Sequence, residues 1–68
     1  MIIVNLAMKQ EDIIKLLEEN NYKFVKKQGL KLFFETPTDD LNADAANAKA
    51  LIKASEFGGA LFFNVGVA

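Results

Sequence analysis

The order of secondary-structure patterns is the feature that most constrains how this chain can fold. A strand pattern, a helix pattern, two strand patterns, a second helix pattern and a final strand pattern follow one another within 68 residues. A chain of this size buries only about 60% of the surface that it exposes when unfolded, so every element must contribute to one core. With 51% apolar residues, the composition can fill that core. We therefore predict a single small α+β domain over residues 1–68.

The first strand and the first helix are predicted from the spacing of apolar residues. Ile2 to Ala7 form an almost wholly apolar run, which is typical of a central strand. Residues 9–21 then have the i, i+3, i+4 spacing of an amphipathic helix, with its apolar stripe at Ile13, Leu16 and Leu17. Asn20-Asn21 can supply the left-handed residue that ends this helix.

Residues 22–36 predict a β-hairpin whose register depends on the length of its loop. A two-residue loop, Gln28-Gly29, would pair Phe24 with Phe33 and mix lysines with apolar side chains on one face. A three-residue loop, Lys27-Gln28-Gly29, puts glycine at the left-handed bulge position that such loops need. We therefore predict the three-residue loop.

This loop determines which hairpin side chains face the core. It pairs Phe24 with Leu32 and Tyr22 with Phe34. The predicted inward-facing residues are Tyr22, Phe24, Leu30, Leu32 and Phe34. The predicted outward-facing residues are Lys23, Val25, Lys31, Phe33 and Glu35.

A second helix and a last strand follow Pro37, which ends the hairpin. The helix is predicted over residues 38–55, with four side chains able to cap its start: Thr38, Asp39, Asp40 and Asn42. Its expected buried stripe is Leu41, Ala45, Ala48 and Ile52. We expect Gly58-Gly59 to end this helix. The last strand should then direct one set of side chains to the same face, namely Leu61, Phe63, Val65 and Val67.

The resulting β-α-β-β-α-β order resembles the split-βαβ, ferredoxin-like plait. In that fold two helices cover one face of an antiparallel sheet whose strand order is 4-1-3-2. Right-handed crossovers in both βαβ units lead to the same arrangement. A different α+β sandwich is the alternative if the hairpin or the first strand is misread.

The residue types that are absent argue against catalysis. The sequence contains no His, Cys, Arg or Trp, so the usual general bases, thiol nucleophiles, disulfides and thiolate metal ligands are missing. Ser55 is its single serine and falls at the end of the second helix, where we expect a hydroxyl bonded to the helix rather than a nucleophile. We therefore predict no enzyme activity, no catalytic residue and no cofactor.

Two segments partly match the ligand patterns of metal sites. Asp40, Asn42 and Asp44 match the first three ligand positions of a calcium loop, but Ala45 and Leu51 stand where that loop needs glycine and glutamate. Helix capping explains the acidic residues better. Met8 lies in the turn where metal carriers of the plait fold use a pair of cysteines, and we expect a core gap-filler there. No metal is predicted.

Nucleic-acid binding has some support in the hairpin. Four lysines cluster there without an acidic residue between them, at Lys23, Lys26, Lys27 and Lys31. Phe33 and Phe62 would lie on the open sheet face, where RNA-recognition modules stack bases. Against this reading, the hairpin lacks the RNP1 pattern, and the net charge is −1. We prefer the alternative that the lysines protect an edge strand from pairing with other chains.

The last strand lacks such protection. From Gly59 to Ala68 the sequence carries no charged residue, although this strand would be a sheet edge. We therefore predict a non-catalytic interaction module that forms a homo-oligomer or binds a protein partner by this edge or by the open face. The interaction residues would be Ile3, Phe33, Phe62 and Asn64. The alternatives are single-stranded nucleic-acid binding, with contacts from Lys23, Lys27 and Lys31, and a small-ligand-binding regulatory domain.

The N-terminal segment and the overall hydropathy bear on localisation. No apolar run approaches the roughly 18 residues of a membrane span, and the first residues lack the basic region of a signal peptide. We therefore predict a cytoplasmic protein without membrane contact. All cationic side chains are lysines and the sequence has six asparagines, which favours an AT-rich bacterial or phage genome.

Overall fold

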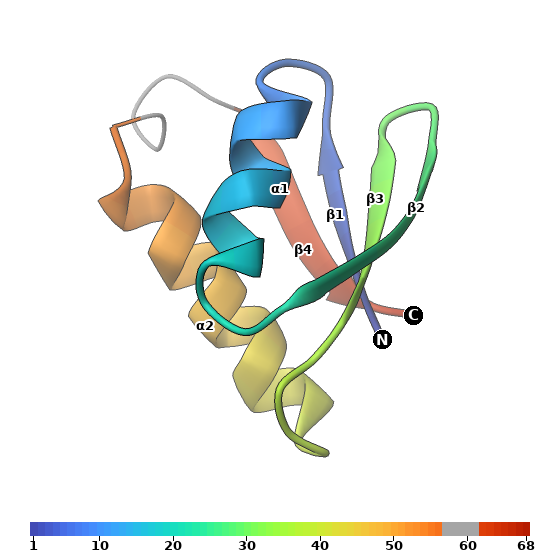
Figure 1. Ribbon diagram of the computed structural model, residues 1–68, viewed down its shortest axis with the longest axis vertical. Coiled ribbons are helices and arrows are strands. Elements are labelled where there is room, and N and C mark those ends of the chain that lie inside the picture. Colours follow the sequence, from blue (N-terminus) through green and yellow to red (C-terminus); the bar gives the residue numbers. More distant parts are fainter. Residues whose placement is uncertain (57–61) are drawn as a thin grey trace.

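The computed structural model describes residues 1–56 and 62–68, and these contain the six predicted elements in the predicted order. They are β1 (Ile2–Leu6), α1 (Gln10–Glu18), β2 (Lys23–Gln28), β3 (Lys31–Glu35), α2 (Leu41–Ala54) and β4 (Phe63–Val67), as Figure 1 shows. The predicted helix break at Gly58-Gly59 and the predicted inward position of Leu61 lie outside the described residues.

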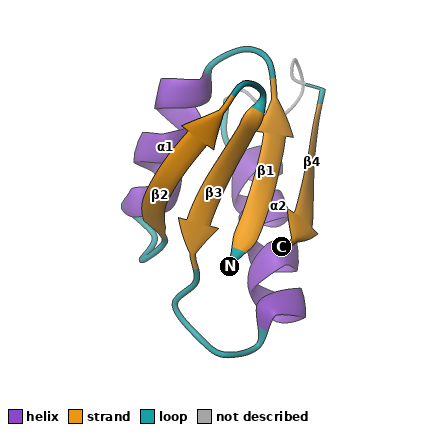
Figure 2. Cartoon of the chain, turned by 90° about the vertical axis from the view of Figure 1, so that its right-hand side faces the viewer, coloured by secondary structure: helices purple, strands orange, loops and turns teal. Residues whose placement is uncertain are grey.

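The four strands form one antiparallel sheet in the order β2-β3-β1-β4, which is the predicted 4-1-3-2 order read from the other edge. Both helices lie on the same face of this sheet and leave the other face uncovered (Figure 2). Among the described residues, β2 and β4 are the two edge strands. The predicted α+β class and sheet order are confirmed.

The core lies between the sheet and the helices, as the alternation along the strands requires. Alternate residues of β1 and β3 are buried, and they meet buried residues from both helices and from the segment before β2. The core residues are Ile2, Val4, Leu6, Ile13, Leu17, Tyr22, Leu32, Phe34, Ala48 and Ile52. Each large apolar side chain buried here contributes about 1.5–3 kcal/mol. Phe24 packs edge-on against Phe34, with ring centroids 5.6 Å apart.

The hairpin register differs from the prediction. Gln28 pairs with Lys31, so the turn consists of Gly29-Leu30. Phe24 pairs with Phe34 rather than with Leu32. Tyr22, which was expected opposite Phe34, precedes β2 but is buried as predicted.

Two local features explain the register. Gly29 has φ of 58°, as expected of the left-handed glycine, but it is the first central residue of a two-residue turn. Val25 is an extra residue in β2. Phe24 and Lys26 pair with the consecutive β3 residues Phe34 and Phe33, so Val25 has no partner in β3. This β-bulge absorbs the residue that the prediction assigned to the loop. Leu30 consequently lies in the turn and is 57% exposed, so its predicted inward position is wrong.

The helix ends follow their local chemistry. Asn21 has φ of 72° and supplies the left-handed residue after α1, as predicted. Of the four possible caps of α2, Asp40 is the one used, and its Oδ1 accepts a hydrogen bond from the Ala43 N–H at 3.1 Å. On the predicted apolar stripe of α2, Ala48 and Ile52 are buried, whereas Leu41 and Ala45 are only half-buried.

Candidate functional site: the open sheet face and the β4 edge

The open face is built from the strand residues whose side chains point away from the helices. Because directly paired residues of antiparallel strands share a face, the register assigns these side chains to rows across the sheet. One row crosses all four strands and contains Lys26, Phe33, Ile3 and Gly66. A second row contains Gln28, Lys31, Asn5 and Asn64, and Lys23 pairs with Glu35 in a third.

Two side-chain contacts join neighbouring strands on this face. The Lys26 ammonium lies 4.9 Å from the centroid of the Phe33 ring, which is the geometry of a cation–π interaction. The Asn5 amide donates a hydrogen bond to the Asn64 Oδ1 at 3.0 Å. Phe33 and Ile3 are half-buried, so the face combines one accessible aromatic ring with cationic and amide groups.

The structure brings three of the four predicted interaction residues onto this face. Ile3 and Phe33 are direct neighbours, and Asn64 lies in the adjacent row. Phe62 precedes β4 and is 98% exposed. It lies beyond the Asn64 row and, with Leu30, lines a hollow of about 360 Å³ at the end of the sheet. The Asn5–Asn64 pair therefore separates Phe62 from Ile3 and Phe33.

The predicted nucleic-acid contacts divide between the two faces. Lys23 and Lys31 pair with outward-facing residues of the neighbouring strands. Lys27 pairs with the buried Leu32, so it leaves the sheet on the helix-covered side. Lys26 takes the open-face position instead, because the bulge at Val25 shifts the alternation of β2. Nothing in the apolar pattern indicated this bulge.

Two backbone hydrogen bonds of β1 show which groups of β4 point toward it. The Leu6 N–H donates to the Leu30 carbonyl at 2.9 Å, so Leu6 directs its backbone groups to the β3 side of β1. The Ala68 N–H donates to the Met1 carbonyl at 3.0 Å, so Met1 directs its carbonyl to the β4 side. Antiparallel pairs alternate between bonded and non-bonded positions. In β4, Asn64 and Gly66 therefore bond to β1, whereas the N–H and C=O groups of three residues point to the outer edge. These residues are Phe63, Val65 and Val67, which are half-buried or exposed.

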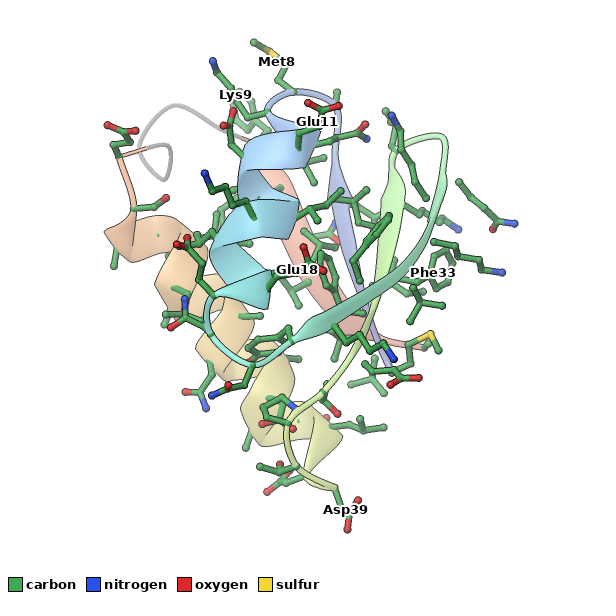
Figure 3. The ribbon with its side chains drawn as sticks, viewed as in Figure 1. Met8, Lys9, Glu11, Glu18, Phe33 and Asp39 are labelled. Carbon is green, nitrogen blue, oxygen red and sulfur yellow. The ribbon has the colours of Figure 1, made fainter. Side chains whose placement is uncertain are left out.

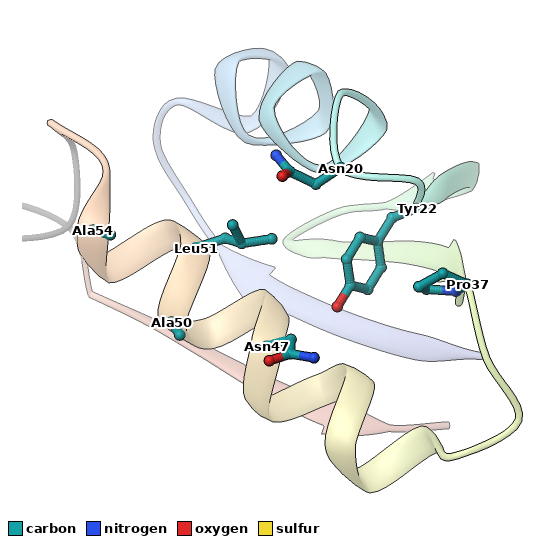
Figure 4. A pocket seen from close by; sticks show the side chains of 7 residues that line it. All are labelled: Asn20, Tyr22, Pro37, Asn47, Ala50, Leu51 and Ala54. Carbon is teal, nitrogen blue, oxygen red and sulfur yellow. The ribbon is translucent and has the colours of Figure 1, made fainter.

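A second depression, of about 390 Å³, lies on the helix side between the end of α1 and α2. Figure 4 shows its seven lining residues: Asn20, Tyr22, Pro37, Asn47, Ala50, Leu51 and Ala54. The Tyr22 hydroxyl donates a 2.6 Å hydrogen bond to the Asp44 backbone carbonyl. Burial raises the pKa of Tyr22, and the nearby Asp44 charge adds to this increase. This hydroxyl is therefore a structural donor rather than a base at neutral pH.

The acidic residues Asp40 and Asp44, which partly match a calcium loop, accept hydrogen bonds from protein groups. Asp44 is buried and its Oδ2 accepts hydrogen bonds from the Thr38 N–H at 3.1 Å and from the Thr38 hydroxyl at 2.7 Å. Asp40 caps α2. Within residues 1–56 and 62–68, no three acidic side chains gather where they could hold a metal ion. The sequence pattern missed the burial of Asp44, since it marked this residue only as a ligand or a cap.

Ser55 and Met8 are the two remaining residues for which the sequence predicted a structural role. The Ser55 hydroxyl donates to the Ile52 carbonyl at 2.6 Å, as expected of a hydroxyl at a helix end. Met8 is 66% exposed, so its predicted role as a core gap-filler is wrong. It belongs to the turn between β1 and α1, where Ala7 and Lys9 are also exposed.

Comparison with known proteins adds no functional information, because no family model, curated protein or solved structure matches this chain. In the part of the chain that the structure describes, neither helix is long and apolar enough to cross a membrane. The open face and the β4 edge are therefore the features of this protein that bear on its function.

Proposed function

We propose that this protein is a non-catalytic interaction module that self-associates by pairing β4 of one copy with β4 of a second copy. The observation that carries the proposal is the contrast between the two sheet edges. β2 carries Lys23, Lys26 and Lys27, whereas β4 carries no charged side chain. Soluble proteins usually protect exposed edges with charges, because such edges pair with other strands. The element order and sheet order also support assigning the fold to the ferredoxin-like plait.

The outward-pointing backbone groups of β4 suit an antiparallel pair with a two-fold axis at Val65. Val65 of one copy would face Val65 of the other, and Phe63 of each copy would face Val67 of the other. A two-fold contact uses the same surface twice, so every hydrogen bond is repeated by symmetry. Each of these residues would exchange both backbone hydrogen bonds, as bonded antiparallel pairs do. The two sheets would then form one continuous sheet.

Charge favours the edge over the open face as the contact between copies. Stacking two open faces would bring Lys23, Lys26 and Lys31 of one copy toward the same lysines of the other. Removing these charges from water and bringing them together costs free energy. Pairing through β4 brings no like charges into the strand contact. With Val65 opposite Val65, Phe62 lies at the end of the paired strands, opposite Ala68 of the second copy.

A proline substitution tests the proposed strand contact. The Val65 N–H points to the outer edge, so Val65→Pro removes a donor of the proposed dimer while keeping the hydrogen bonds between β1 and β4. We expect sedimentation velocity to give a concentration-dependent dimer for the wild type and a folded monomer for Val65→Pro. Val65→Ala is the matched control, because it keeps the N–H and should keep the dimer.

Three outcomes would contradict the edge contact. One is a wild-type monomer at every concentration, and another is a Val65→Pro protein that dimerises with unchanged affinity. The third is a monomer produced by Phe62→Lys while Val65→Pro remains dimeric, which would assign the contact to the open face. Circular dichroism of each variant excludes unfolding as the cause.

A further inference from the structure

Charge is unevenly distributed along this chain. Residues 22–35 contain four of the eight lysines and one acidic residue, Glu35, which gives the hairpin a net charge of +3. The remaining residues contain four lysines and eight acidic residues, a net charge of −4. The overall value of −1 therefore conceals a basic and an acidic part, and the basic part can attract an anionic partner that the whole molecule would not.

The fold converts this sequence asymmetry into two faces. Lys23, Lys26 and Lys31 occupy outward positions of β2 and β3, so they share the open face with Glu35, which pairs with Lys23. Lys27 lies on the helix-covered side, so the four charged strand residues of the open face carry a net charge of +2. Figure 3 shows Glu11 and Glu18 on α1, with Phe33 on the opposite side of the sheet. A polyanion is therefore attracted to the open face and repelled from the helical side.

An aromatic ring distinguishes this face from a simple basic patch. The Phe33 ring is accessible enough for the Lys26 ammonium to lie over it at 4.9 Å. A nucleobase can occupy the same ring face by stacking, because every base has a π-face. Lys26 is exposed and flexible, so its ammonium can then move to a neighbouring phosphate. The Asn5 and Asn64 amides in the next row offer donors and acceptors to base edges.

We propose that the open face binds single-stranded nucleic acid, with a base stacked on Phe33 and phosphates contacted by Lys23, Lys26 and Lys31. Stacking on the Phe33 ring requires an unpaired base, which excludes the interior of a duplex as the partner. Without arginine the face lacks that residue's planar bidentate contacts to phosphate and guanine, and stacking accepts every base, so sequence preference should be weak. This activity goes beyond the proposed self-association and does not require it, because the lysines lie on β2 and β3 and the dimer contact lies on β4.

The test is fluorescence anisotropy with a labelled oligodeoxythymidylate of about 12 nucleotides, titrated at several salt concentrations. Three phosphate contacts predict a slope of about −2 in a plot of log affinity against log salt. Lys26→Gln and Lys31→Gln should each reduce the slope by about 0.7. Phe33→Leu should weaken binding at least about fivefold without changing the slope, since stacking is not a phosphate contact.

Lys49→Gln is the matched control, because Lys49 is an exposed lysine on α2 and should change neither affinity nor slope. The proposal is overturned if the oligonucleotide does not bind at low salt, or if Lys49→Gln acts like Lys26→Gln. Displacement of the oligonucleotide by an equal charge of polyglutamate would also overturn it, in favour of an acidic protein partner. The same titration of Val65→Pro separates the two proposals, since a monomer should retain the slope.

Discussion

At the scale of single residues, Tyr22 and Asp44 connect the segment between α1 and β2 with α2. Tyr22 precedes β2 and its hydroxyl donates to the backbone carbonyl of Asp44 in α2. The Asp44 carboxylate in turn holds Thr38, in the loop before α2. Buried polar groups need such partners, and the described residues contain no buried side-chain nitrogen or oxygen without one. We therefore assign this cluster to stability rather than to chemistry.

Tyr22 should make stability depend on pH above the ordinary titration range of tyrosine. Burial first, and the Asp44 charge second, raise the pKa of Tyr22 above 10.0 in the folded state. The unfolded chain therefore loses this proton first, so the stability is fully present below about pH 10 and decreases as pH rises toward the folded pKa. We expect Tyr22→Phe to cost about 1 kcal/mol at neutral pH and less at higher pH.

Urea unfolding of the wild type and Tyr22→Phe at a series of pH values measures this difference. Both proteins share the same lysines, so the titration of lysine cancels between them. A free-energy difference that stays constant from neutral pH to above pH 10 would mean that the hydroxyl is not linked to folding as described.

At the scale of elements, the hairpin shows what a sequence pattern can and cannot predict. The alternation of apolar residues correctly indicated two strands, and glycine correctly indicated the left-handed position. The bulge at Val25 was not predictable, because β-bulges depend on the packing of a strand against its partner and leave no residue signature of their own here. Lys26 consequently lies on the open face, and Lys27, which was predicted in the loop, lies in β2 on the helix-covered side.

The turn predicts the effect of a substitution at Gly29. A side chain at φ of 58° is strained, and no other atom lies within 4 Å of the position that a Cβ would take. Gly29→Ala should therefore lower the free energy of unfolding by about 1 kcal/mol through backbone conformation alone. Gly66→Ala is the control, since Gly66 has equal space without a positive φ, and it should cost nothing. Equal losses in denaturant unfolding would contradict this explanation.

At the scale of the whole molecule, the order of elements predicted the sheet order because few right-handed, antiparallel arrangements connect six short elements. The candidate site was predicted less well. The predicted interaction residues Ile3, Phe33 and Asn64 lie on one face, but the positions of Phe62 and Lys26 depend on where β4 begins and on the bulge. The sequence did not indicate which backbone groups of β4 point outward, because this depends on the hydrogen bonds between the strands.

Amide hydrogen exchange of β4, followed by NMR at low and high protein concentration, tests the proposed self-association most directly. The N–H groups of Asn64 and Gly66 bond to β1 and should be protected at both concentrations. The N–H groups of Phe63, Val65 and Val67 should exchange rapidly in the dilute protein and become protected as the dimer forms. If these three amides exchange rapidly at concentrations where the protein sediments as a dimer, then β4 is not the contact between the two copies.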